Sequence, residues 1–183
     1  AALRLTPPSV LALPTSTAPA VLDGITGLGS VRTALLVGAP TDAERLAAAH
    51  ALHRAGAPSD VAILAVHAPT GARVLWGECR ASGGATGLHT YPDREVVQVV
   101  DPETGEHVGS AASNSAGAGE LGRSPIGLRG SALFRWRTAD LVSGIATDPC
   151  VSCHRRVPRV EGLRRGALVS GLGEEGRLDL RAV

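Results

Sequence analysis

The sequence contains no lysine, so all 18 of its basic residues are arginines, and it contains no methionine. Acidic residues number 17 and leave a formal net charge of +1. This balance gives no basic surface of the kind that binds nucleic acid or an anionic membrane. The aromatic residues are two Trp, one Tyr and one Phe, too few for a platform on which single-stranded bases stack. We therefore expect neither nucleic acid nor a membrane as a partner.

Long apolar runs and disulfide frameworks are missing as well. No stretch of eighteen or more apolar residues occurs, so no membrane-spanning helix is predicted. Prolines interrupt the first twenty residues, which have no basic segment ahead of an apolar run, so no signal peptide is predicted. The three cysteines, two of them in a C-x-x-C pair, fit a metal site in a reducing compartment better than disulfides. The cytoplasm is the expected location.

The first third of the sequence predicts a strand, a helix and a second strand. Apolar runs at residues 32–37 and 61–66 are typical of buried parallel strands. Between them, Thr41 and Glu44 have the spacing of a capping box at the start of a helix that runs to about Ala55. Strand, helix and strand at this spacing make a right-handed βαβ unit.

The second half of the sequence is richer in strand signals. Residues 95–100 carry many β-branched side chains, and the segment 101–105 places Pro and Gly where a tight turn needs them. Together they predict a hairpin that returns near residues 107–108. Residues 131–137 and 140–145 predict further strands.

The predicted fold class is therefore α/β with two parts. Residues 1–73 are expected to form the βαβ part of a doubly wound subdomain. Residues 74–183 are expected to form a β-rich, mostly antiparallel subdomain that contains the metal candidates. Two proline-containing stretches, residues 6–13 and 18–28, predict short helices packed outside the βαβ unit. A chain of 183 residues can bury one core or two small ones.

Three cysteines and one histidine predict a structural zinc site. Cys150 and Cys153 form the C-x-x-C pair, whose tight turn can point both sulfur atoms at one zinc ion. Cys79 and His89 lie far earlier in the chain and could complete a closed tetrahedral set of ligands. A zinc ion bound in this way would join two distant segments.

Other interpretations of these residues stay open. His154 follows the pair directly and could replace His89 as the nitrogen ligand. The run from Cys150 to His154 also fits the C-x-x-C-H pattern of covalent haem attachment. That attachment needs an oxidising compartment and a distal ligand, commonly methionine, which this sequence lacks. A third possibility is that the thiols bind no metal.

Two features of the sequence suit a nucleotide. The segment Gly38-Ala39-Pro40 follows the first predicted strand directly, and ligands of open α/β sheets bind beyond the carboxyl ends of the strands. Asp140 stands at a strand end after the arginine-rich segment 135–137. A carboxylate there can accept hydrogen bonds from both ribose hydroxyls of a nucleotide. The alternative is that Asp140 is an ordinary solvated acid.

Six short motifs follow one another along most of the chain. In order they are Glu78-Cys79, Gly87-Leu88-His89, Asp101-Pro102-Glu103-Thr104-Gly105, Gly119-Glu120-Leu121, Arg135-Trp136-Arg137-Thr138-Ala139-Asp140 and Cys150-Val151-Ser152-Cys153. The series resembles the phenylacetate-CoA ligase family, whose pattern runs E-C, G-L-H, D-P-E-T-G, G-E-L, R-Y-R-T-x-D and C-x-C-G-R. Six motifs in one order are far more specific than any one of them. The chain is similar to a middle portion of such an enzyme.

The resemblance implies an adenylate-forming acid–CoA ligase. Such an enzyme uses ATP to convert a carboxylic acid, here an aromatic one, into an acyl-adenylate and then a CoA thioester. The implied partners are therefore ATP or AMP, the acid and CoA. By position, Asp140 would hold the ribose, and Gly38-Ala39-Pro40 would contribute backbone to the adenine pocket. Arg137, and Arg177 in a sequence that resembles the hinge before the C-terminal lid, would lie near the phosphate or ribose.

The sequence also departs from the family pattern. Residues 65–69 replace the motif Y-G-x-S/T-E, so no aromatic ring is left for the adenine unless His67 supplies it. Pro69 stands where the family has the magnesium-binding Glu, so a magnesium site is not expected. The phosphate loop is expected upstream of Ala1, and no lysine is present for the catalytic role in the lid. The isolated chain is thus predicted to be inactive. The alternative function is a non-catalytic nucleotide-binding or interaction module that zinc holds together.

Overall fold

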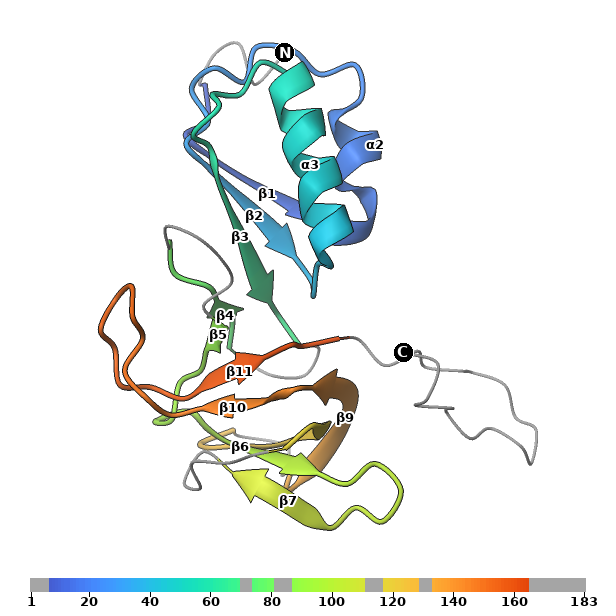
Figure 1. Cartoon of the computed structure of the whole chain (residues 1–183), viewed down its shortest axis with the longest axis vertical. Coiled ribbons are helices and arrows are strands. Elements are labelled where there is room, and N and C mark those ends of the chain that lie inside the picture. The colour runs from blue at the N-terminus through green and yellow to red at the C-terminus, as the bar shows by residue number, and fades with distance from the viewer. Residues whose placement is uncertain (1–6, 70–73, 81–86, 111–116, 129–132, 165–183) are drawn as a thin grey trace, which may run out of the picture.

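The computed structural model describes residues 7–69, 74–80, 87–110, 117–128 and 133–164, so the predicted nucleotide ligand Arg177 lies outside the described residues. The chain forms two sheets (Figure 1). The larger sheet has seven strands in the order β1-β2-β3-β4-β5-β11-β10, and the smaller has four in the order β7-β6-β8-β9. This is the predicted mixture of a parallel α/β part and an antiparallel part. Among these residues, no helix has the length and apolarity that a membrane crossing requires.

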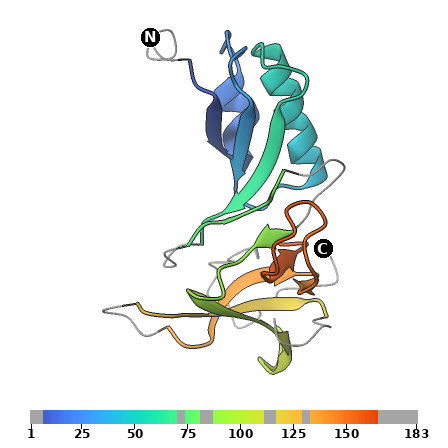
Figure 2. The same ribbon diagram turned by 90° about the vertical axis from the view of Figure 1, so that its left-hand side faces the viewer.

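The first part of the chain forms the parallel portion of the large sheet, with helices on one face (Figure 2). Its elements are β1 (Val10–Pro14), the 3-10 helix η1 (Thr15–Thr17), α2 (Ala18–Leu22), β2 (Thr33–Val37), α3 (Asp42–Arg54) and β3 (Ala62–His67). β2 lies between β1 and β3 and is parallel to both, with Leu36 opposite Leu13 and Ala65. The predicted strand–helix–strand unit is confirmed.

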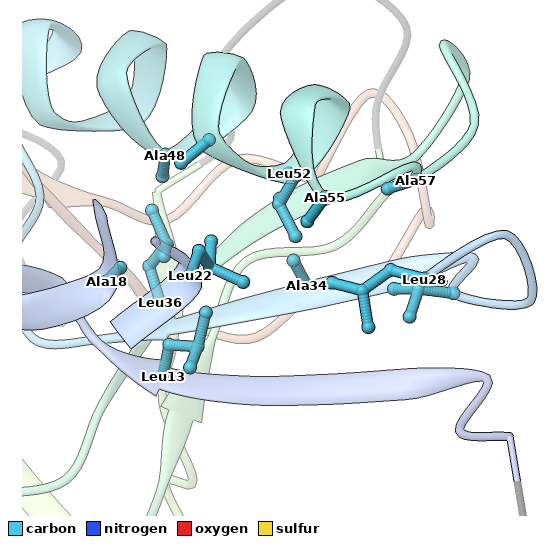
Figure 3. Packing of buried hydrophobic residues seen from close by; sticks show 12 residues of the cluster. Leu13, Ala18, Leu22, Leu28, Ala34, Leu36, Ala48, Leu52, Ala55 and Ala57 are labelled. Atoms are coloured by element: carbon cyan, nitrogen blue, oxygen red, sulfur yellow. The ribbon is translucent and has the colours of Figure 1, made fainter. Parts of the chain in front are cut away.

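A core of small aliphatic side chains fixes α3 on the sheet (Figure 3). The helix begins at a capping box, in which Thr41 Oγ1 accepts from the backbone N–H of Glu44 and the Glu44 carboxylate accepts from that of Thr41. Ala48 and Leu52 of the helix are buried. The buried set comprises Leu13, Ala18, Leu22, Leu28, Val31, Ala34, Leu36, Ala48, Ala51, Leu52, Ala55 and Ala57. Close contact between short side chains lets the helix lie near the strands.

The second part of the chain contains the remaining strands. They are β4 (Trp76–Gly77), β5 (Leu88–His89), β6 (Glu95–Val100), β7 (His107–Ser110), β8 (Gly119–Pro125), β9 (Trp136–Val142), β10 (Gly144–Ala146) and β11 (Arg159–Glu161). The predicted hairpin is β6–β7, and all pairs in the smaller sheet are antiparallel. At its turn, Asp101 Oδ1 accepts from the backbone N–H groups of Glu103 and Thr104, which lowers the pKa of Asp101. A second core lies between the two sheets.

The prediction of a helix at residues 6–13 is wrong. Residues 10–14 form β1, which extends the parallel sheet at its edge. Pairing with β2 buries Leu13 under the helices, whereas Val10 on the other face is 53% exposed. The two-residue alternation of a strand thus overrides the helix start that the prolines suggest.

The helix predicted at residues 18–28 is real but shorter. α2 ends at Leu22. Gly24 and Gly27 follow with φ angles of 74° and 84°, which belong to the left-handed region that ends a helix. Leu28 is nevertheless buried, because the loop returns to the end of α3, where the Leu28 N–H donates to the Ala55 carbonyl at 3.0 Å.

A buried ion pair within the smaller sheet is hydrogen-bonded to a tryptophan of the larger sheet. Glu95 of β6 accepts hydrogen bonds from the Trp76 indole of β4 and from the Arg123 guanidinium of β8. The Arg123 guanidinium carbon also lies 4.5 Å from the centroid of the Trp76 ring. None of these three residues is more than 2% exposed. The Glu95 charge therefore depends on Arg123 for compensation in the protein interior.

Replacing Glu95 by Ala should lower the free energy of unfolding by about 3–5 kcal/mol, because the Arg123 charge is then buried without a partner. The double variant Glu95→Leu/Arg123→Met should lose much less, since it removes both charges and keeps the volume filled. Urea unfolding would measure both. Glu106→Ala, at an exposed acid, is the control. If Glu95→Ala lowers the free energy of unfolding no more than Glu106→Ala does, the ion pair does not contribute to stability.

Candidate functional site

Three sulfur atoms and one imidazole nitrogen converge in the second part of the chain. One ligand atom from each of Cys79, His89, Cys150 and Cys153 lies within 4.8 Å of the others. Cys79 Sγ is 3.5 Å from Cys150 Sγ, and Cys153 Sγ is 3.4 Å from His89 Nε2. A tetrahedral zinc ion with Zn–S bonds of about 2.3 Å places its ligand atoms about 3.8 Å apart. The structure thus brings the four predicted residues to a spacing that could hold a metal ion.

The backbone sets the orientation of the His89 ring. His89 lies in β5, directly opposite Gly77 of β4. Its Nδ1 is 3.3 Å from the Gly77 carbonyl oxygen, close enough for an Nδ1–H to donate to it. That hydrogen bond would leave Nε2 unprotonated and facing the sulfur atoms. Ligating histidines are commonly oriented by a second hydrogen bond of this kind.

The C-x-x-C pair lies on a tight turn. The His154 N–H donates to the Cys150 carbonyl at 2.8 Å, and the Cys150 N–H donates to the Arg155 carbonyl at 3.0 Å. His154 closes the turn with a φ of 57°, and its side chain is exposed and outside the group of four. Of the two candidate histidines, His89 is therefore the one placed with the sulfur atoms.

The turn also changes the acidity of one thiol. The pKa of Cys150 is lowered to about 6, chiefly because the backbone N–H of Cys153 donates to its sulfur, with a further contribution from Ser152. Burial of the thiol opposes this effect. The thiolate is the form that binds metals. Cys150 is therefore mostly in its metal-binding form at neutral pH.

The carboxyl ends of β2 and β3 hold the predicted nucleotide segment. The Gly38 N–H donates to the Val66 carbonyl at 2.8 Å, so the loop after β2 is tied to the end of β3. Gly38 has a φ of 139°, and a Cβ added there would lie 3.0 Å from Thr15 Oγ1. Glycine is thus required at the point where the chain leaves β2 toward Ala39 and Pro40.

Asp140 lies at the same end of β3. Its carboxylate Oδ2 is 3.5 Å from Nε2 of His67, the last residue of the strand. The Asp140 side chain is 13% exposed, so it is not a freely solvated acid. His67 is buried and its ring packs against Trp76, with the ring centroids 5.6 Å apart. His67 therefore offers no exposed ring face to an adenine in this structure.

A cavity of about 470 Å³ opens beside these strand ends. It is lined by residues 39–42, 87–88 and 160–164, with Ala65 and Glu78. Ala65 is the residue predicted to replace the aromatic residue of the ligase motif, and none of the described residues that line the cavity is aromatic. Two backbone hydrogen bonds of 2.8 Å join Arg164 in the cavity wall to Leu141, the neighbour of Asp140.

The Arg137 guanidinium is hydrogen-bonded to a carboxylate and a backbone carbonyl of the protein. Its Nε donates to the Glu120 carboxylate at 2.7 Å, and its Nη2 donates to the same carboxylate and to the Pro102 carbonyl. The hydrogen bond to Glu120 raises the pKa of Arg137. Its side chain is still 45% exposed. A role for Arg137 beside a phosphate or ribose remains a prediction, as does that of Arg177.

Similar folds occur in acyl-CoA ligases. The chain superposes on a 2-hydroxyisobutyryl-CoA ligase, solved in the postadenylation state with R3-HIB-AMP, with a TM-score of 0.66 and 13% identity over 90% of this chain and 34% of that one. ATP-bound MatB from Rhodopseudomonas palustris matches with a TM-score of 0.55 and 15% identity, over 87% of this chain and 31% of that one. The long-chain-fatty-acid-CoA ligase FadD1 from Archaeoglobus fulgidus matches with a TM-score of 0.53 and 9% identity, over 87% of this chain and 35% of that one. No protein-family model and no curated protein sequence matches the chain.

At these identities the likeness establishes the fold. The chain has a fold found in acyl-CoA ligases and spans about a third of the length of the ligases it resembles. The broader part of the sequence resemblance, to acid–CoA ligases, is thus supported at the level of the fold. The narrower part, to phenylacetate-CoA ligases, stays a prediction.

Sequence reasoning missed two polar contacts near the candidate site. One is the approach of His67 to Asp140, and the other is the ion pair between Glu95 and Arg123. The signal for the ion pair is Glu95, a charged residue at an inward position of the otherwise mostly apolar strand β6, which the alternation of a sheet can reveal. The contact between His67 and Asp140 joins segments far apart in the chain and has no local signal.

Proposed function

We propose that this chain is part of an ATP-dependent acid–CoA ligase, which forms an acyl-adenylate and then an acyl-CoA thioester. The observation that carries the proposal is the match of 90% of the chain to a 2-hydroxyisobutyryl-CoA ligase at a TM-score of 0.66. The six ordered sequence motifs support it. On the motif resemblance the acid is aromatic, and the partners are a nucleotide, the acid and CoA.

In this proposal the nucleotide binds at the carboxyl ends of β2 and β3. Asp140 accepts hydrogen bonds from the ribose hydroxyls, and Gly38-Ala39-Pro40 borders the adenine. Support comes from the hydrogen bond of Gly38 to Val66 and the contact of Asp140 with His67, because residues 66 and 67 are adjacent in β3. The cavity lined by Ala39, Pro40 and Ala65 gives the base a place to lie.

Asp140→Ala should weaken AMP binding by about ten- to a hundredfold, since a charge-assisted hydrogen bond contributes about 1.5–3 kcal/mol. Isothermal titration calorimetry of the unaltered chain and the variant measures the difference. Asp93→Ala, at a carboxylate whose side chain is 74% exposed, is the matched control and should bind as the unaltered chain does. Equal affinity of the Asp140 variant and the unaltered chain would contradict the assignment of the ribose site.

The 183 residues alone should show no adenylation. A triphosphate grip, a magnesium carboxylate and a cation at the developing charge each lower such a barrier by several kcal/mol. Pro69 occupies the carboxylate position, and no lysine occurs in the sequence. The assay is acid-dependent pyrophosphate release from ATP with phenylacetate, benzoate and a panel of fatty acids. Turnover that Asp140→Ala abolishes would show that the chain is an enzyme by itself.

The same absences favour a second candidate function. A chain without the magnesium carboxylate or a lysine could serve as a non-catalytic module that binds a nucleotide or a protein partner. AMP binding without pyrophosphate release would fit this module and the ligase portion alike. Restored turnover on adding the remainder of a ligase would distinguish them, because only a ligase portion contributes to the reaction.

We further propose that Cys79, His89, Cys150 and Cys153 bind one structural zinc ion. The support is the spacing of their ligand atoms, within 4.8 Å, and the mixture of three thiols and one imidazole, which zinc favours. No position is left open for a substrate when all four ligands come from the protein, so the site is structural. The grouping of Cys150 and Cys153 with Cys79 and His89 favours a single metal ion over covalent haem attachment.

Protein purified under reducing conditions should contain about one zinc per chain, and a chelator should lower its melting temperature, because binding to such a site adds to the folding free energy. Cys79→Ser and Cys153→Ser should each remove the metal, whereas His154→Gly should retain it. Zinc affinity should fall as the pH drops below about 6, where the Cys150 thiolate takes up a proton. Elemental analysis and thermal unfolding provide the readouts. Unchanged zinc content in Cys79→Ser would disprove the shared site.

A further inference from the structure

His67 is a buried histidine whose ring nitrogens lack hydrogen-bond partners. The residue is 1% exposed, and neither Nδ1 nor Nε2 has a hydrogen-bond partner among the described residues. Its polar neighbour is Asp140, whose Oδ2 lies 3.5 Å from Nε2. A buried polar atom without a partner costs about 1–3 kcal/mol, so its presence in a native structure requires an explanation.

The neighbours of His67 hold its ring in place. One contact is the ring of Trp76, tilted by 39° at a centroid distance of 5.6 Å. Trp76 is fully buried and cannot move easily, because its indole N–H donates to Glu95 and the Arg123 guanidinium lies against its ring. Backbone pairing of β3 with β4 sets His67 directly opposite Trp76. Nε2 is therefore held at one place beside Asp140.

We propose that His67 is the positioning residue for Asp140 in nucleotide binding. The polar contact of Nε2 with Oδ2 at 3.5 Å restricts the rotation of the carboxylate, and an Nε2–H that donates across it would use one acceptor position of Asp140. A carboxylate has about four such positions, so enough remain for two ribose hydroxyls. A carboxylate that is already oriented loses less conformational freedom when the ligand binds. The distance of 3.5 Å is long for a hydrogen bond, and contacts of this kind tighten in the liganded complex.

This inference rests on the proposed ribose-binding role of Asp140. It goes beyond that role by assigning a function to a residue that the nucleotide does not touch. His67 is buried behind Asp140, so it acts on the nucleotide through the carboxylate alone. Its replacement should therefore affect binding only when Asp140 is present.

The test compares two replacements of His67. His67→Phe keeps a ring against Trp76 but removes both nitrogens, and AMP affinity should fall by about fivefold to tenfold, as expected for the loss of one hydrogen bond of ordinary net strength. His67→Gln places an amide N–H near the position of Nε2 and should recover part of that loss. His53→Phe, at an exposed histidine of α3, is the control. Unchanged AMP affinity in His67→Phe would overturn the proposal.

A double-mutant cycle separates positioning from general damage to the fold. If His67 acts through Asp140, the variant Asp140→Ala/His67→Phe should bind AMP as weakly as Asp140→Ala alone. If the two losses add, His67 affects the structure independently of Asp140, and the proposal is wrong. Should His67→Phe prove unstable, the same cycle is run with His67→Leu, which also removes both ring nitrogens.

A second measurement does not depend on AMP binding. In nitrogen-15 NMR spectra of the free protein, Asp140→Asn should shift the Nε2 signal of His67 and leave that of His53 unchanged. If the unaltered chain does not bind AMP, the proposed nucleotide site fails, and this measurement still decides whether His67 and Asp140 interact. An unmoved His67 signal would overturn the inference even if AMP binds.

Discussion

The pairing of β3 with β4 is the constraint on which both parts of the chain depend. Val66 lies opposite Gly77 and His67 opposite Trp76. The next residue, Glu78, accepts the Ala65 N–H at 2.8 Å through its carboxylate and donates its own N–H to the Ala65 carbonyl at 3.0 Å. Its carboxylate also binds the guanidinium of Arg45 on α3. One short segment thus joins a parallel sheet under helices to a β-rich part with a core of its own.

Both candidate sites lie next to the β3–β4 pair, which is the junction between the two parts of the chain. A parallel strand ends at His67, and ligand-binding loops of α/β sheets gather at such ends. The backbone of Val66 binds the loop at Gly38, and the ring of His67 faces Asp140. On the other side of the junction, Cys79 follows Glu78 directly and enters the group of potential metal ligands. Only a few residues of the β3–β4 pair therefore connect the nucleotide site with the group of potential metal ligands.

The sequence predicts best those features that are formed by residues close together in the chain. The capping box of Thr41 and Glu44 and the turn after Asp101 are both present, because each is made by residues close in the chain. The structure also brings the three cysteines and His89 close together, which their residue types predict for a group that could hold one metal ion. The strand at Val10–Pro14 was missed, since only pairing with β2 makes those residues extended. The contact of His67 with Asp140 was missed for the same reason: it forms between β3 and β9, and no spacing in the sequence encodes it.

The potential metal ligands lie beside the two shortest strands of the large sheet. β4 and β5 have two residues each, too short for strands that must be stable without further support. Cys79 follows β4 by two residues, His89 lies in β5, and Cys150 and Cys153 precede β11, which pairs with β5. A metal ion bound by this group would hold these short strands together with free energy that their own hydrogen bonds do not supply. Since β4 also carries Trp76, against which His67 packs, ligation on one side of the junction would stabilise the position of Asp140 on the other.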